Sequence, residues 1–325
     1  MKLTGITWIT TYNCNLSCKH CFFETKGPKH YMDPRMVDEA LASLKNTKHM
    51  FWQHLSGGEI FLNEEKLFSI IHNIRKHFTK DLGLSTNAFW AKTPDITREK
   101  VTKLMDAGVT GIALSADYYH QQEMDIDGPK NLASVVSDLD LKTHSYIMGA
   151  RLSDDVDVAN KTNAASDEIA KQVNQGLNIP YAKAVERSIG KGCLINTPKT
   201  KGIPQGKCTE LNTCLGERSP FNPAMIWIDA YGNVMICYGV IIGNLNQQSL
   251  NDIIENYSPE RYQPINNLAQ NGPKTLYHEA VKNGYNVPEN YFDVCDICYQ
   301  SRSALRKNYP KVFGPNECYP VSGTY

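Results

Sequence analysis

The sequence has no apolar run that approaches the ~18–20 residues needed to cross a bilayer. Its first residues also meet polar side chains too early for a secretory signal. It has no excess of charge, since 34 Lys and Arg residues balance 34 Asp and Glu residues. A protein that binds nucleic acid mainly through its backbone phosphates usually carries an excess of Lys and Arg, so nucleic acid is not the expected partner. We therefore expect a soluble, cytoplasmic protein that acts neither on nucleic acid nor at a membrane.

The first half of the chain alternates extended with amphipathic segments. Extended segments are expected at residues 3–11, 50–56, 82–86, 111–115, 142–148 and 181–185. Between them, apolar side chains recur three and four positions apart, and one such helix begins at Thr93 as N-cap with Pro94 at its first position. This alternation predicts a parallel sheet with right-handed crossovers. Its six units suit an α/β fold built on an open, partial (β/α)6 TIM-type barrel over residues 1–190.

The pattern changes from about Gly190, where Gly, Pro, Lys and Cys follow one another without helical periodicity. Residues 191–325 are therefore expected to form a linker and a smaller, cysteine-rich domain. The chain has 10 cysteines, which in a large protein without an export signal are expected to bind metal or do chemistry rather than form disulfides.

Three of these cysteines form one tight group, Cys14-x3-Cys18-x2-Cys21, directly after the first extended segment. Three thiolates can hold three corners of a [4Fe–4S] cluster and leave one iron open to a small molecule. A zinc site completed by His20 or His30, or three structural thiols, are the competing interpretations. Because structural zinc usually uses paired C-x2-C motifs, the spacing favours the iron–sulfur cluster.

A second motif, Gly57-Gly58-Glu59, follows the second extended segment. With the cysteine loop it resembles the radical S-adenosylmethionine (SAM) superfamily over residues 3–190. In that family SAM chelates the open iron, and reduction splits it into methionine and a 5′-deoxyadenosyl radical that abstracts hydrogen from the substrate. The resemblance implies that these three residues receive the methionyl ammonium, because glycines allow close backbone approach and a carboxylate pairs with a cation. A plain turn at the end of a strand is the alternative.

The same resemblance implies further SAM contacts. His20 matches the position that commonly packs on the adenine, although an exposed loop histidine is the alternative. Four polar residues near strand ends match positions used for the ribose and methionyl groups, and each could instead be a cap or turn residue. They are Ser85, Asn87, Ser115 and Asp117.

The C-terminal half resembles the auxiliary-cluster extension of radical SAM enzymes in its short, "twitch" form. The resemblance implies one auxiliary [4Fe–4S] cluster on four cysteines, Cys214, Cys237, Cys295 and Cys298. The long form is absent, because Ala304 and Asn308 stand where its further cysteines would be. The spacer after Cys214 is longer than usual, which leaves Cys208 as a substitute ligand. Whether Cys318 is a ligand stays open, and a structural zinc on the same thiolates is the alternative.

Within the superfamily, the chain is most similar to peptidyl epimerases of ribosomally made peptides. The shared stretches are residues 56–62, 87–90, 115–120 and 188–190. This implies a peptide or small natural product as substrate and a flavodoxin- or ferredoxin-type reductant. A sugar or aminocyclitol substrate is the alternative within the family. A non-enzymatic iron–sulfur electron-transfer protein is the alternative from another class.

One position departs from those epimerases and bears on the reaction. They carry a second cysteine directly after the G-x4-C cysteine, which returns hydrogen to the substrate radical, and this chain has Tyr238 there. Cys193 follows the sixth extended segment and is the spare thiol best placed to reach the site. Hydrogen donation from Tyr238 or Cys193 would give epimerisation, whereas electron loss to the auxiliary cluster would give oxidation. Tyr238 as a packing residue is the alternative.

Overall fold

The computed structural model describes residues 1–27, 29–139, 141, 145–151, 156–185, 191, 200–201, 203, 206, 223–288, 290–291 and 293–320. Cys193, Cys208, Cys214 and the 188–190 stretch lie outside the described residues.

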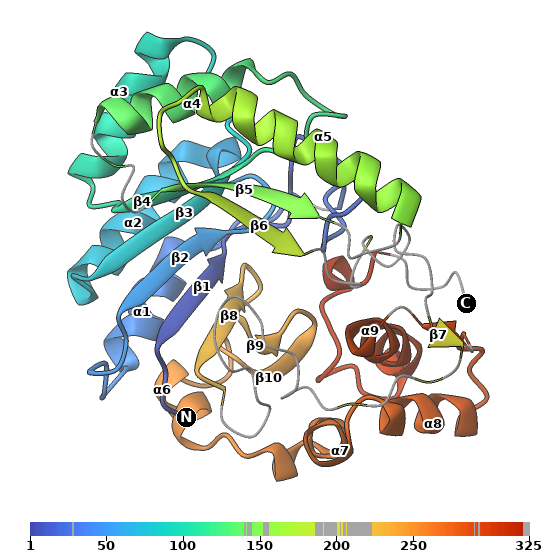
Figure 1. Cartoon of the computed structure of the whole chain (residues 1–325). Helices are drawn as coiled ribbons and strands as arrows, with labels where there is room; N and C mark the ends of the chain where they lie inside the picture. Colours follow the sequence, from blue (N-terminus) through green and yellow to red (C-terminus); the bar gives the residue numbers. More distant parts are fainter. Residues whose placement is uncertain are drawn as a thin grey trace.

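The predicted parallel sheet is present, and its strands follow one another in chain order. They are β1 (Gly5–Ile9), β2 (Trp52–Ser56), β3 (Asp81–Thr86), β4 (Gly111–Ser115), β5 (Tyr146–Arg151) and β6 (Tyr181–Val185). The crossovers carry helices α1 (Pro34–Ser43), α2 (Glu64–His77), α3 (Pro94–Asp106), α4 (Asp127–Asp138) and α5 (Val156–Asn174). Figure 1 shows these helices along the outer side of the sheet, as a partial barrel requires.

Local sequence accounts for where these helices begin and which face they bury. The Thr93 side chain accepts a hydrogen bond from the N–H of Ile96, and Pro94 occupies the first turn of α3. Asp33 caps α1 in the same way, and that helix buries Val37, Ala40 and Leu41. The spacing of these residues, three and four apart, places them on one face.

Three successive antiparallel strands from the C-terminal half, called the hairpin below, extend the same sheet. They are β8 (Met225–Asp229), β9 (Asn233–Cys237) and β10 (Val240–Asn244), and β8 pairs parallel with β1. The full order is β10-β9-β8-β1-β2-β3-β4-β5-β6. The carboxylate of Asp229, fully buried, accepts from the N–H groups of Tyr231 and Asn233 and from the Tyr12 hydroxyl at 3.0 Å. This aspartate therefore ties the hairpin turn to the loop after β1.

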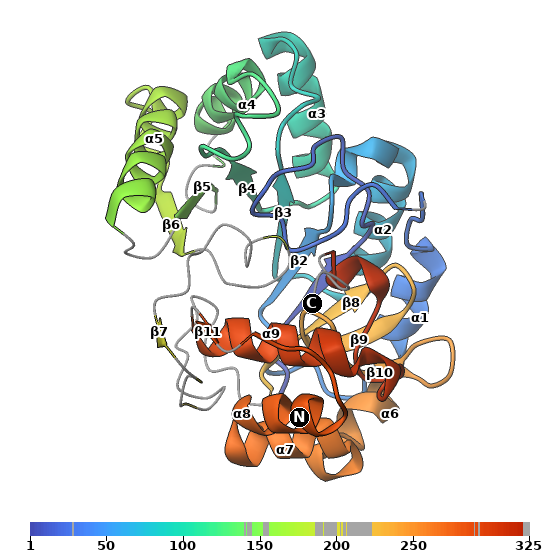
Figure 2. The same cartoon turned by 90° about the vertical axis from the view of Figure 1, so that its right-hand side faces the viewer.

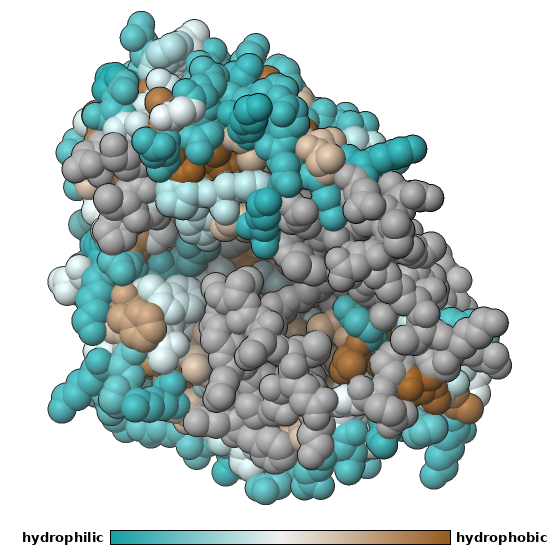
Figure 3. Space-filling view, in the orientation of Figure 1, coloured by the Kyte–Doolittle hydropathy of each residue, from teal (hydrophilic) through white to brown (hydrophobic). Residues whose placement is uncertain are grey.

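The remaining C-terminal helices lie near the hairpin, and two short strands that pair with each other lie apart from it (Figure 2). They are α6 (Leu250–Glu255), α7 (Gln263–Asn271), α8 (Lys274–Lys282), α9 (Val294–Ala304) and the short strands β7 (Thr200–Lys201) and β11 (Asn290–Tyr291). Hydrophilic side chains predominate over the outer helices in the view of Figure 3. Within the described ranges, no helix has the length and hydropathy of a membrane span.

Candidate active site

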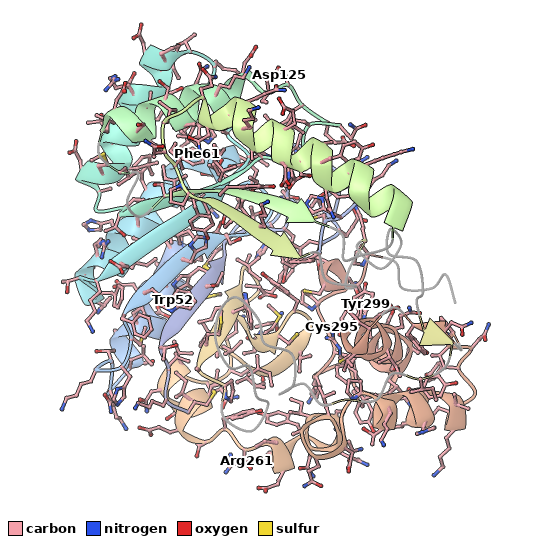
Figure 4. All side chains as sticks on the ribbon, viewed as in Figure 1. Trp52, Phe61, Asp125, Arg261, Cys295 and Tyr299 are labelled. Carbon is pink, nitrogen blue, oxygen red and sulfur yellow. The ribbon has the colours of Figure 1, made fainter. Side chains whose placement is uncertain are left out.

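A cavity of about 580 Å³ lies within the curve of the sheet, and the loops after the strands reach into it. Alternate residues of one strand point the same way, so Trp52, His54 and Ser56 of β2 all line this cavity. Trp52, labelled in Figure 4, lies so close over Gly5 of β1 that a Cβ there would meet its ring at 2.0 Å. A large side chain that packs directly on a glycine therefore bounds this part of the cavity.

All three motif cysteines line this cavity from the loop after β1. The thiol of Cys14 accepts from the N–H of Leu16 at 3.4 Å and from Asn87 Nδ2 at 3.7 Å, and the thiol of Cys21 accepts from the N–H of Phe23 at 3.5 Å. Burial raises the pKa of the Cys14 thiol to about 12 and raises that of the Cys18 thiol as well. Bound metal reverses this, because a coordinated thiol is deprotonated.

The donor set fits an iron–sulfur cluster better than a single zinc ion. Tetrahedral zinc thiolates at about 2.3 Å from the metal lie within about 4 Å of one another. Among the described residues, the only set of three metal-ligating side chains with all ligand atoms within 4.8 Å is His20, Asp117 and His120, which includes no cysteine. Thiols that are grouped on one loop yet further apart suit ligands to different irons of one cluster.

The Gly-Gly-Glu segment is joined to the cysteine loop by its backbone. The N–H of Gly58 donates to the carbonyl of Thr11 at 2.8 Å, and the N–H of Glu59 donates to the carbonyl of Asn13 at 2.7 Å. Gly57 adopts φ 145°, a conformation open mainly to glycine. Both glycines line the cavity. Their first role in this structure is therefore to let two backbone segments come together.

Glu59 is fully buried, and its carboxylate braces this segment against β3. One oxygen accepts from the N–H of Phe61 and the hydroxyl of Thr86, and the other accepts from the N–H of Asn87 at 2.8 Å. Burial raises the pKa of Glu59 to about 7, while these hydrogen bonds act to lower it. A contact between its carboxylate and the methionyl ammonium of SAM stays a prediction.

Replacing Glu59 with Gln is expected to destabilise the protein by about 1–3 kcal/mol, because an amide nitrogen would face a buried N–H donor. Urea unfolding measures the change. Glu65→Gln is the matched control, since Glu65 is an exposed residue in the first turn of α2. Equal unfolding midpoints for the two variants would show that the carboxylate does not brace the loop.

The other predicted SAM contacts gather at the same edge of the cavity. His20 stacks on Tyr119 with ring centroids 4.9 Å apart, and burial lowers its pKa to about 4, so the imidazole is neutral at pH 7. Asp117 accepts from the N–H groups of Tyr119 and His120, and its second oxygen lies 2.9 Å from His120 Nδ1. Asn87 Nδ2 donates to Asn15 Oδ1 at 2.9 Å. Their roles toward SAM stay predictions.

Ser85 and Ser115 line the cavity from β3 and β4. The hydroxyl of Ser85 lies 2.7 Å from Nε2 of the half-buried His54, whose pKa desolvation lowers to about 4. His54 and His120 were not predicted as site residues. The signal for His54 is its position two residues before Ser56 on β2. Alternate residues of a strand point to the same face, so both residues line the cavity.

Tyr238 lines the same cavity from the residue directly after β9. Its ring packs at 5.1–5.2 Å from Phe22, Phe23 and Trp227. This aromatic group joins the cysteine loop to the hairpin. It places Tyr238 at the cavity, whereas its predicted role as hydrogen donor stays a prediction.

The described auxiliary cysteines come from two elements. Cys237 ends β9, and Cys295 and Cys298 lie on α9, where Figure 4 labels Cys295. All seven described cysteines are free of disulfides. The thiols of Cys237 and Cys298 both interact electrostatically with Arg302, so the end of β9 and α9 meet around this guanidinium. The predicted fourth ligand, Cys214, lies outside the described residues.

Comparison with known proteins agrees with this geometry. Residues 8–135, which carry the cysteine loop and the Gly-Gly-Glu segment, match the Radical SAM superfamily. The chain contains a radical SAM domain. This domain implies a [4Fe–4S] cluster and SAM as cofactors. The match to residues 8–135 does not extend to the C-terminal half.

Individual relatives are more distant. The "Putative peptide biosynthesis protein YydG" of Bacillus subtilis (strain 168) is 23% identical over 147 residues, which are 44% of this chain and 46% of that protein. The matched part thus spans less than half of the relative. Streptococcus suis SuiB, solved bound to precursor peptide SuiA, superposes with a TM-score of 0.53 at 12% identity and covers 91% of this chain and 76% of its own. The structure of anSMEcpe with bound AdoMet and Cp18Cys peptide also superposes with a TM-score of 0.53 at 12% identity. The match covers 95% of this chain and 97% of anSMEcpe. At these identities the two structures support the α/β fold with its partial barrel.

Proposed function

We propose that this radical SAM enzyme abstracts a hydrogen atom from a carbon of a peptide during maturation of a natural product. The observation that carries the proposal is that one cavity is lined by Cys14, Cys18 and Cys21 together with Gly57 and Gly58. A [4Fe–4S] cluster bound there would supply the electron that splits SAM into methionine and the 5′-deoxyadenosyl radical. The aromatic wall around Tyr238 would exclude water from the reacting carbon.

The peptide substrate is inferred from the relatives. YydG is named for peptide biosynthesis, SuiB was solved with a precursor peptide, and anSMEcpe was solved with a peptide. We extend this substrate class to the present chain and propose a flavodoxin- or ferredoxin-type protein as its reductant.

We also propose that residues 191–325 form a linker and a twitch domain with one auxiliary [4Fe–4S] cluster on Cys214, Cys237, Cys295 and Cys298. Two observations support it. Cys237 and Cys298, 61 positions apart, both face Arg302. The described cysteines also form no group tight enough for one zinc ion.

The reaction is expected to be epimerisation if Tyr238 or Cys193 returns hydrogen to the substrate radical. It is expected to be oxidation if the radical passes an electron to the auxiliary cluster and releases a proton. Epimerisation in heavy water would add one solvent deuterium per product, whereas oxidation would lower the product mass by two hydrogens. Mass spectrometry of the product distinguishes the two. Tyr238→Phe is expected to reduce solvent-deuterium incorporation, with Tyr257→Phe as control because Tyr257 stacks on Tyr262, away from the residues that line the cavity. Unchanged incorporation and rate in both Tyr238→Phe and Cys193→Ala would exclude both donors.

A further inference from the structure

Arg302 is a buried cation in the middle of the cysteine-bearing helix α9. Its residue exposure is 1%, and it lies one turn after Cys298. The guanidinium donates to the carbonyl oxygen of Tyr238 at 2.8 Å, to the hydroxyl of Tyr319 at 3.1 Å and to the carbonyl oxygen of Cys298 at 3.3 Å. It also lies over the Tyr319 ring, 5.7 Å from the centroid. Each of these contacts is to a neutral group.

A negative charge nearby stabilises a buried guanidinium, because taking this cation out of water without a counter-charge costs several kcal/mol. No carboxylate of the described residues pairs with Arg302. The ionisable groups that interact with it are the thiols of Cys298, Cys237 and Cys318 and the Tyr319 phenol. Burial raises the pKa of Tyr319, which keeps this phenol neutral. The thiols are thus the groups that can supply the missing charge, and they do so as thiolates when they bind metal.

We propose that Arg302 balances the negative charge of the auxiliary cluster and raises its reduction potential. This inference rests on the proposed function, since it requires the proposed auxiliary cluster, whose ligands among the described residues are Cys237, Cys295 and Cys298. A positive charge in a low-dielectric site stabilises the more negative, reduced form of a cluster. The guanidinium that faces the thiols also holds the carbonyl of Tyr238, so it links the auxiliary site to the wall of the cavity.

The test isolates the auxiliary cluster in the full chain. In a background with Cys14, Cys18 and Cys21 replaced by Ala, the reconstituted protein should hold about four irons. A redox titration followed by electron paramagnetic resonance then gives the potential of this cluster alone. Arg302→Gln is expected to shift the midpoint to a more negative value, while Arg302→Lys retains most of the wild-type value. Arg306→Gln is the control, because Arg306 also lies over Tyr319 but is partly exposed, so solvent screens its charge.

Each outcome separates the inference from the proposed function. An iron-free background protein would refute the auxiliary cluster itself and, with it, the role of Arg302. A cluster that binds normally in Arg302→Gln at an unchanged potential would overturn the inference alone. If Arg302→Gln folds by circular dichroism but loses iron that Arg302→Lys keeps, the positive charge is needed for assembly, as proposed. Loss of iron from a folded Arg302→Lys protein would show that charge is not the property required.

Discussion

Replacing Cys14, Cys18 and Cys21 together with alanine is expected to abolish reductive cleavage of SAM. All three thiols line one cavity, and no other described cysteine does. Without them the domain has no ligands for the cluster that SAM must chelate. The measurement is anaerobic 5′-deoxyadenosine formation with a strong chemical reductant, and the expected rate equals the background without protein. Iron should fall by about half, from about eight to about four atoms per chain, because the auxiliary site is untouched.

The matched control for this experiment is Ser17→Ala. Ser17 lies on the same loop, and its hydroxyl contacts Lys191 Nζ at 3.3 Å rather than a cysteine. This variant should retain SAM cleavage and the full iron content. Cleavage that survives in the triple alanine variant would place the radical chemistry elsewhere in the protein. A loss of all iron in that variant would instead argue against a separate auxiliary site.

Gly58→Ala is expected to destabilise the protein by about 2–4 kcal/mol and to disrupt the cysteine loop. A Cβ at this position would meet the carbonyl oxygen of Asn13 at 1.9 Å and that of Tyr12 at 2.7 Å. These atoms belong to the backbone directly before Cys14, so no side-chain rotation can relieve the clash. The loop must move, and its three thiols move with it.

Chemical unfolding together with iron content after reconstitution measures both effects. Gly27→Ala is the control, because a Cβ on Gly27 would meet no atom within 4 Å. We expect the control to unfold at the wild-type midpoint with full iron. Gly58→Ala that matches the control in stability and iron would contradict the close approach of the two backbone segments.

The sequence predicted the barrel strands well because their signals are local. The segments 111–115 and 181–185 agree with the observed β4 and β6, and Thr93 caps α3 as expected. Apolar runs and caps depend on neighbours a few residues away, which the sequence displays directly.

Contacts between distant segments had no such signal. The parallel pairing of β8 with β1 joins residues about 220 positions apart, as in the register of Gly5 with Met225, so the continuity of the sheet across residue 190 was not predicted. Arg302 was missed for the same reason, because its charge acquires a meaning only when Cys237 and α9 lie together. The resemblance to a family placed the cysteine loop and Gly57-Gly58-Glu59, and the structure adds that the two motifs hydrogen-bond through their backbones.

The most direct test of hydrogen abstraction from a peptide is transfer of deuterium from substrate to 5′-deoxyadenosine. The protein would be incubated anaerobically with SAM, a reductant and short peptides encoded beside its gene, each deuterated at the α-carbons. The account predicts 5′-deoxyadenosine that carries one substrate deuterium, detected by mass spectrometry, and formed only when the three loop cysteines are present. Abundant 5′-deoxyadenosine without label from any of these peptides, together with label from a deuterated sugar or aminocyclitol, would contradict a peptide substrate.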